Sequence, residues 1–255
     1  ELFISMIWVN GQAGVGLDPG DAAVLHGVGV FETVRTYGLS LFRWDAHRHR
    51  LKKSAEALQI PFEEDLIERE VLQAVGVDRR IRITLTGNGN RVVESRPIDP
   101  SYVGRPRRVA PIEWTPSVGL PGDVKHTSRA SWLASATALG VDEVLLCSAD
   151  GRILEANRSN VFAVLGGRMK TPPLRGEQLA GVTRAALLDA AACIDMPIDE
   201  EDVPTWAPFE ALYLSSTLKE LAPVESIGEE QLRVDHPLGV ELLAAFRELV
   251  ARETA

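Results

Sequence analysis

Hydrophobic and polar positions along the first part of the chain alternate between strand-like and helical patterns. Strand-like runs separated by the turn signals N-G and Y-G-L predict strands over Ile7–Val9, Val30–Thr36 and Ser40–Arg43. Apolar residues at helical spacing predict a helix over 44–58, with Asp45 as a candidate N-cap and Pro61 beyond its end. The patterns then predict a helix over about 64–76, a strand running into a glycine-rich loop over 80–90, and a strand over Arg107–Trp114.

The segment from Pro116 to Gly122 interrupts this order, because it contains several turn-forming residues and little hydrophobic periodicity. Beyond it the patterns predict helices over about 129–139, 182–193 and 238–253, and strands over 141–147, 151–155, 159–165 and 211–215, with a D-G turn at 150–151. We therefore expect an α+β protein with a smaller domain over 1–115, a linker over 116–122 and a larger domain over 123–255.

Composition is that of an enzyme-sized globular protein. A chain of 255 residues with 45% hydrophobic residues can bury a sizeable core. The formal net charge is −9, and no basic cluster is long enough to indicate a nucleic-acid partner. No apolar run approaches the length of a membrane span, and the opening run E-L-F-I-S lacks the features of a signal peptide, so we expect a cytoplasmic protein without a membrane partner.

Two cysteines and the first five residues complete this general picture. Cys147 and Cys193 lie in apolar stretches without metal-ligand spacing, so we expect two buried free thiols and no metal site. Residues 1–5 precede the first predicted strand and are interpreted as an upstream extension or an expression remnant, so they are left out of the predicted fold.

One lysine and one glutamate are candidate chemical groups. Lys125 lies in the run D-V-K-H-T-S-R and Glu155 in the run L-E-A-N-R-S-N-V-F. A lysine that forms a Schiff base and a carboxylate that keeps a ring nitrogen protonated are the groups that pyridoxal phosphate chemistry needs most. Most lysine and glutamate residues are solvated surface residues, so the pair is informative only together with other motifs.

Three further motifs surround this pair. H-R-H-R-L at 47–51 lies upstream, T-P-P-L-R-G-E-Q-L-A-G-V-T-R at 171–184 lies downstream, and L-Y-L-S-S-T-L-K-E-L-A-P-V at 212–224 follows. In this order the motifs resemble the class IV aminotransferase family, the fold type IV pyridoxal phosphate enzymes, from about Met6 to about Val224. The resemblance implies a two-domain homodimeric enzyme with pyridoxal 5'-phosphate in the interdomain cleft.

The resemblance also implies roles for the residues that match the family motifs. Lys125, on a strand after the linker, is implied as the Schiff-base lysine, and Glu155 as the partner of the ring nitrogen. Arg50, in the pattern H-x-x-R-L, is implied to hold the phosphate through a two-pronged contact. Arg48 is offset by two positions and should lie on another face of the helix. Each could instead be an ordinary surface or strand-end residue.

Further phosphate contacts are implied near the end of the resemblance. Val182 and Thr183 open a predicted helix, where backbone N–H groups suit an anion, and Thr217 matches a family hydroxyl that contacts phosphate. An ordinary helix start and a strand cap are the alternatives. After Glu155 the chain reads A-N-R-S-N where the family often has G-T-x-S-N, so the family glycine is missing.

The choice of reaction depends on the residues around the lysine. The run K-H-T-S-R resembles lyases of this family that act on aminodeoxychorismate, through Lys125, His126 and Arg129. The tyrosine usual in branched-chain transaminases is replaced by Ala130 and Ser131, and the R-x-H carboxylate trap of D-amino acid transaminases is absent. We therefore expect a lyase that converts 4-amino-4-deoxychorismate to 4-aminobenzoate and pyruvate in folate synthesis.

Two alternatives stay open. A class IV aminotransferase that moves amino groups between small branched-chain or D-amino acids and 2-oxo acids would use the same residues. A binding protein that kept the fold without activity is disfavoured by the intact Lys125 and Glu155. For either enzyme, Arg82, Arg91 and Arg129 are candidates for gripping a carboxylate of a small-molecule substrate, although each could also be a surface residue.

Overall fold

The computed structural model describes residues 5–255. Of the segment 1–5, which the sequence analysis leaves out of the predicted fold, only Ser5 is among the described residues. The chain forms two compact units. The first contains the described residues up to Asp99 together with Val124–Arg129 and Glu253–Ala255, and the second contains Pro100–Asp123 and Ala130–Arg252. Compact units and functional domains need not coincide. The predicted domain limits therefore stay a prediction.

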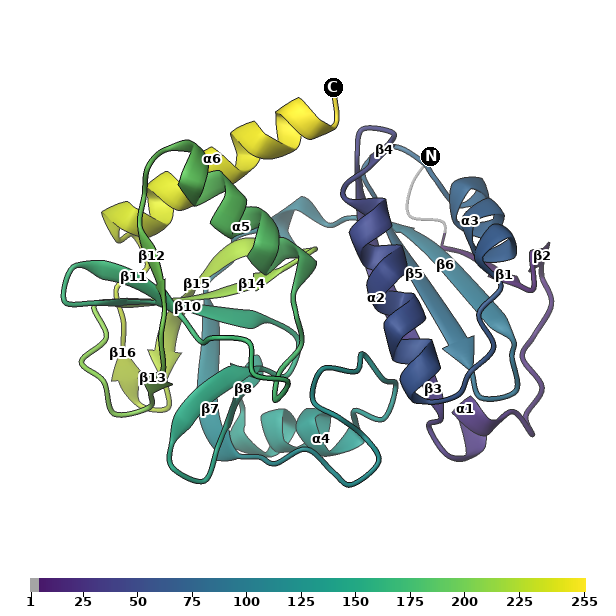
Figure 1. Ribbon diagram of the computed structural model, residues 1–255, viewed down its shortest axis with the longest axis horizontal. Helices are drawn as coiled ribbons and strands as arrows, with labels where there is room; N and C mark the ends of the chain where they lie inside the picture. The colour runs from purple at the N-terminus through teal and green to yellow at the C-terminus, as the bar shows by residue number, and fades with distance from the viewer. Residues whose placement is uncertain (1–4) are drawn as a thin grey trace. The chain divides into compact units, whose positions relative to one another are not determined.

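The first unit is built on a six-stranded sheet with the strand order β2-β1-β6-β5-β3-β4 (Figure 1). Its strands are β1 (Met6–Val9), β2 (Gln12–Ala13), β3 (Gly29–Tyr37), β4 (Ser40–Leu41), β5 (Arg79–Thr86) and β6 (Arg91–Pro97). Its helices are α1 (Ala22–Leu25), α2 (Trp44–Ala57) and α3 (Glu64–Gln73). All neighbouring strands of this sheet are antiparallel, which allows one face to be packed and the other to carry polar residues.

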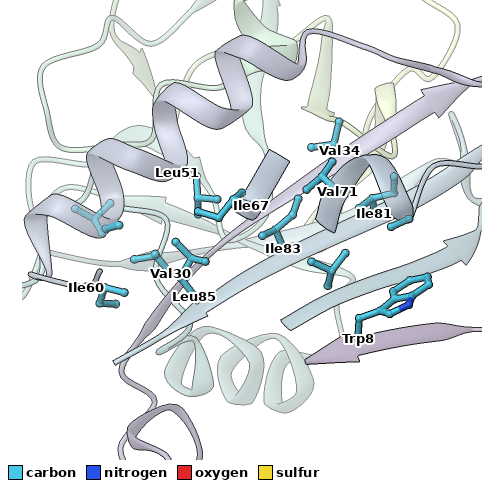
Figure 2. Close-up of a cluster of buried hydrophobic side chains, with 14 residues drawn as sticks. Trp8, Val30, Val34, Leu51, Ile60, Ile67, Val71, Ile81, Ile83 and Leu85 are labelled. Carbon is cyan, nitrogen blue, oxygen red and sulfur yellow. The ribbon is translucent and has the colours of Figure 1, made fainter. Parts of the chain in front are cut away.

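Helices α2 and α3 cover one face of this sheet, and the core of the unit lies between them and the strands (Figure 2). The core includes Leu51, Ile67, Val71, Ile81 and Ile83. Burying one such side chain fully contributes roughly 1.5–3 kcal/mol. Successive side chains of a strand point to opposite faces, so Arg80 and Arg82 on β5 project from the face opposite the core.

The second unit contains a ten-stranded sheet with the order β12-β11-β10-β14-β15-β7-β8-β9-β13, and β16 pairs with β15. Its strands are β7 (Arg107–Glu113), β8 (Glu143–Cys147), β9 (Arg152–Ala156), β10 (Asn160–Leu165), β11 (Arg168–Thr171), β12 (Ile198–Glu200), β13 (Val203–Pro204), β14 (Ala211–Ser216), β15 (Glu220–Ile227) and β16 (Glu230–Gln231). Its helices are the 3-10 helix η1 (Pro100–Tyr102), α4 (Ala130–Leu139), α5 (Val182–Cys193) and α6 (Pro237–Glu253).

This sheet encloses one core, and a second, smaller cluster lies between β8 and α4. β9 and β10 are not neighbours in the strand order, yet a bridge between Ala156 and Ser159 joins their ends. The enclosed core includes Val109, Leu145, Val161, Leu212 and Leu214. At the start of β10, Asn160 pairs with Ser215 near the end of β14. The segment that follows Glu155 and the segment that leads to Thr217 therefore lie side by side.

Most predicted elements occur near their predicted limits, but three details are wrong. Helix α2 begins at Trp44, so Asp45 lies in its first turn and pairs with Arg48 instead of capping the helix. Lys125 does not lie on a regular strand, because its segment makes only an isolated bridge with β3. Cys193, the last residue of α5, is exposed, whereas Cys147 is buried as predicted. No helix in the described part of the chain combines the length and apolarity that crossing a bilayer requires.

Candidate active site

The backbone around Lys125 is fixed by hydrogen bonds within the first unit. The Lys125 carbonyl oxygen accepts from the Phe31 N–H at 3.0 Å, and the Lys125 N–H donates to Ser54 Oγ of α2 at 3.2 Å. Two residues further on, the Thr127 N–H donates to the Gly29 carbonyl at 2.9 Å. Because strand and helix both hold this segment, Lys125 has a defined position although no regular strand forms there.

Three cationic side chains gather around the ring of Phe31. The Lys125 Nζ lies 4.9 Å, the Arg82 Cζ 3.7 Å and the Arg129 Cζ 5.4 Å from the ring centroid. Burial, followed by the charges of Arg80 and Arg129, lowers the pKa of Arg82 to about 10. Among the described residues no carboxylate lies within ion-pair distance of the Arg82 guanidinium. This group of cations is suited to attract an anion.

His126, next to Lys125 in the chain, adds no charge to this group at neutral pH. Its side chain is buried, and burial together with the charges of Arg129 and Lys125 lowers the pKa of His126 to about 4. The imidazole is therefore neutral over the physiological range.

Arg50 projects from α2 onto a buried carboxylate on β3. Its Nε lies 2.6 Å from Glu32 Oε1 and its Nη2 2.9 Å from Glu32 Oε2, while His47 Nδ1 lies 2.8 Å from the same Oε2. Burial acts to raise the pKa of Glu32, but the charge of Arg50 and the hydrogen bond of His47 outweigh it and hold that pKa well below its usual range. This fork fixes the plane of the Arg50 guanidinium.

The other arginines that the sequence singles out have different partners. Arg48 pairs with Asp45 at 2.9 Å and with Glu68 at 3.0 Å, so it faces away from Glu32, as the helical spacing predicts. Arg91 pairs with Glu63 at 2.6 Å and with Glu70 at 3.0 Å. The Arg91 guanidinium is thus already neutralised by two carboxylates. Of the three predicted carboxylate-gripping residues, the structure brings only Arg82 and Arg129 close to Lys125.

In the second unit, Glu155 lies on β9 with 8% of its surface exposed. Asn160 connects it with the start of α5: the Asn160 Nδ2 lies 3.5 Å from Glu155 Oε2 and donates to the Leu179 carbonyl at 2.8 Å. A Cβ on Gly181 would lie 1.9 Å from Asn160 Oδ1, so only glycine allows this close approach.

Several donors of the second unit suit an anion. Helix α5 begins at Val182 without a side-chain cap, so the N–H groups of Val182 and Thr183 are not satisfied by a capping side chain. The helix dipole adds a partial positive charge at this end. Ser215 Oγ is buried and has no hydrogen-bond partner among the described residues. Thr217 lies in the turn that follows β14.

The structure adds three residues that the sequence did not single out. Phe31 provides the ring that the three cations share, Glu32 fixes Arg50, and Asn160 joins β9 to the start of α5. A signal for Glu32 was present, because it is a carboxylate that alternates with Val30 and Val34 on one face of the predicted strand. Phe31 and Asn160 are ordinary for their positions, so their contacts become visible only in the folded chain.

Comparison with known proteins identifies the family. The model of the family "Amino-transferase class IV" matches residues 29–227. A probable branched-chain-amino-acid aminotransferase of Thermotoga maritima is 28% identical over 219 residues, which are 82% of this chain and 80% of the relative. An aminodeoxychorismate lyase of Vibrio harveyi is 24% identical over 260 residues, which are 92% of this chain and 96% of the relative.

Solved structures share the architecture. The crystal structure of a putative branched-chain amino acid aminotransferase from Thermotoga maritima matches with a TM-score of 0.86 and 25% identity, over 97% of this chain and 96% of that one. A hypothetical aminotransferase from Mycobacterium tuberculosis in its PLP-bound form matches with a TM-score of 0.83 and 20% identity, over 98% and 100% of the two chains. The chain therefore belongs to the class IV aminotransferase family of pyridoxal phosphate-dependent enzymes and has their fold type IV architecture.

Proposed function

We propose that this protein is an aminotransferase that moves an amino group between a small amino acid and a 2-oxo acid. The supporting observation is the cationic group around Phe31, where Arg82 and Arg129 accompany Lys125. Both substrates of such a reaction carry a carboxylate, which a guanidinium binds well. Several similar proteins are named branched-chain-amino-acid aminotransferases, which favours this reaction over the lyase reaction expected from the K-H-T-S-R run.

The described residues fit pyridoxal phosphate. The buried hydroxyl of Ser215, which has no partner among the described residues, and the start of α5, which no side chain caps, are donors of the kind that a phosphate requires. We assign the phosphate to Arg50, Val182, Thr183 and Thr217. Glu155 would hold the ring nitrogen, and Lys125 would form the covalent attachment.

When bound, the cofactor supplies an electron sink for the bond cleavage at the substrate α-carbon. In the proposed mechanism Lys125 takes the proton from that carbon and later returns one. Glu155 keeps the ring nitrogen protonated by offering a carboxylate as its partner. Arg82 and Arg129 bind the substrate carboxylate and thereby orient the α-carbon toward Lys125.

Lysis of aminodeoxychorismate is the second candidate function. It is favoured by one specific feature, the segment in which Lys125, His126 and Arg129 follow one another with the spacing of the family lyases. The named lyase of Vibrio harveyi is also among the similar proteins. This reaction would use the same lysine and the same cofactor contacts.

The attachment site can be tested directly. Borohydride reduction of the protein loaded with pyridoxal phosphate, followed by peptide mass mapping, should place the adduct on Lys125. A Lys125→Met variant should show no adduct. An adduct on Lys170 or Lys219, or no adduct on the unmodified protein, would overturn the assignment.

A parallel assay separates the two reactions. The loaded protein is mixed with branched-chain L-amino acids, with D-amino acids and with aminodeoxychorismate, each with and without 2-oxoglutarate. For an aminotransferase we expect amino acids to bleach the cofactor absorbance, and turnover to continue only when the 2-oxo acid is present. Formation of 4-aminobenzoate and pyruvate without any 2-oxo acid, combined with no bleaching by amino acids, would establish the lyase instead.

A further inference from the structure

The second unit contains a buried ion pair that the proposed catalytic roles do not use. Lys219 is 2% exposed and Glu143 is fully buried. The Lys219 Nζ lies 2.7 Å from Glu143 Oε1 and donates to Ser159 Oγ at 2.9 Å, and the Ser159 hydroxyl donates to Glu143 Oε2 at 3.0 Å. The ammonium, the hydroxyl and the carboxylate thus form a closed triangle.

We propose that Lys219 is a positioning residue that fixes the spacing between the turn that follows Glu155 and the turn that carries Thr217. The proposal rests on the proposed function, because these two residues are assigned to opposite ends of the cofactor, the ring nitrogen and the phosphate.

One corner of the triangle belongs to the turn that carries Thr217. This turn runs from Ser216 to Lys219 and is closed by the Lys219 N–H, which donates to the Ser216 carbonyl at 3.1 Å. Thr217 is the second of its four residues. Because the turn is short, holding the Lys219 side chain in place also restricts the position of Thr217.

The second corner belongs to the turn that follows Glu155. Ala156 and Ser159 exchange backbone hydrogen bonds, the Ala156 N–H donating at 2.7 Å and the Ser159 N–H at 3.2 Å. Glu155 precedes this turn directly, and Asn160, which contacts Glu155, follows it. The Ser159 hydroxyl therefore ties the Glu155 side of the site to Lys219.

The third corner anchors the triangle in the sheet. Glu143 is the first residue of β8. This strand pairs with β9, which contains Glu155. Burial acts to raise the pKa of Glu143, but the charges of Lys219 and Arg158 outweigh it and hold that pKa below its usual range. A buried carboxylate and a buried ammonium hold each other in place, since neither can leave without stranding the other.

The test uses a variant that removes both charges together. Lys219→Met/Glu143→Gln leaves no buried charge without a partner, so the unit should still fold. Its matched control is Lys170→Met/Glu201→Gln, which removes an exposed ion pair of 2.6 Å in the same unit. The dissociation constant for pyridoxal phosphate is measured for each protein by titrating the cofactor-free form and following the absorbance.

We expect the buried-pair variant to bind pyridoxal phosphate about tenfold more weakly, the loss that accompanies one well-placed phosphate hydrogen bond. The control should bind like the unchanged protein. Adding Thr217→Ala should weaken binding less in the buried-pair variant than in the unchanged protein, because the Thr217 contact is already misplaced there.

A lower melting temperature with unchanged cofactor affinity, or an equal effect of Thr217→Ala in both backgrounds, would overturn the proposal. If the double variant does not fold, Ser159→Ala takes its place, because it cuts the link between the turns and leaves the ion pair intact. That variant should weaken cofactor binding in the same direction, and unchanged binding would also overturn the proposal. If the unchanged protein does not attach the cofactor at Lys125, the proposed function fails instead.

Discussion

Single charged residues of this protein differ mainly in how far they are removed from water. Arg48 is partly exposed and its carboxylate partners Asp45 and Glu68 are exposed, and such surface pairs contribute about 0–1 kcal/mol. Arg50 faces the fully buried Glu32, and removing one partner of such a pair costs roughly 3–5 kcal/mol, because the other charge stays buried. Two arginines that are two positions apart in one helix are therefore not equivalent.

This difference gives the first prediction. Arg50→Ala should lower the free energy of unfolding by about 3–5 kcal/mol and weaken the binding of pyridoxal phosphate by tenfold or more. Arg48→Ala should change stability by less than about 1 kcal/mol and leave the cofactor affinity unchanged. Urea unfolding and cofactor titration of both variants check this. Equal cofactor affinity in the two variants would show that Arg50 does not reach the phosphate.

The carboxylate of Glu155 gives the second prediction. Glu155→Gln keeps the shape of the side chain, so the cofactor should still bind. An amide cannot hold the ring nitrogen protonated, and the loss of a buried ionic partner is worth several kcal/mol, which corresponds to a factor of about a hundred or more in kcat. Turnover measured at equal cofactor content decides. A variant with the kcat of the unchanged protein would make Glu155 a structural residue.

Elements of this fold are defined best where long hydrophobic periodicity and local end signals agree. Helix α5 has the predicted limits, because its apolar pattern spans three turns and Gly181 precedes it. The sequence patterns do not predict strands β6 and β15, because each contains charged residues and a proline among its apolar positions. Pairing with neighbouring strands, not their own pattern, makes these segments strands.

Gly181, directly before α5, leaves little room for a side chain. Its φ of −71° is open to any residue, so the obstacle to a side chain is steric: an added Cβ would lie 1.9 Å from Asn160 Oδ1 and 3.2 Å from Arg184 Cβ. Gly181→Ala should cost about 1–3 kcal/mol of stability through overpacking and should weaken cofactor binding by displacing Asn160. Gly16→Ala is the control, because its Cβ would meet no atom within 4 Å and its φ is not positive. Urea unfolding should separate the two, and equal stability would contradict the steric argument.

Across the whole molecule, chain segments far apart in sequence share one compact unit. Arg43 pairs with Glu253 at 2.8 Å, and the Ser40 hydroxyl donates to the Thr254 carbonyl at 3.1 Å, so the last residues belong to the first unit. The segment around Lys125 joins the same unit through β3. Such pairings are long-range and have no local sequence signal.

We also infer that the enzyme is a homodimer, as the resemblance to its family implies. Multi-angle light scattering of the purified protein should give twice the chain mass of 27.8 kDa, at concentrations from micromolar upward. A mass of one chain over this whole range would contradict the inference.

The family, the cofactor and the order of the main elements can all be predicted from local patterns of the chain. Helix α2, helix α5 and the strands around Glu155 follow from periodicity and turn residues, which act over a few neighbouring positions. The motif that contains Lys125 likewise consists of adjacent residues, so it can be recognised without a structure.

The partners of the charged groups, in contrast, become visible only in the folded chain. Arg82 and Arg91 each precede a β-branched apolar residue, yet one stacks on Phe31 near Lys125 and the other is held by Glu63 and Glu70. The buried contact between Lys219 and Glu143 likewise joins residues that are 76 positions apart in the chain. Burial and charge pairing depend on distances in space, and these distances are set by the packing of strands, which no local pattern specifies.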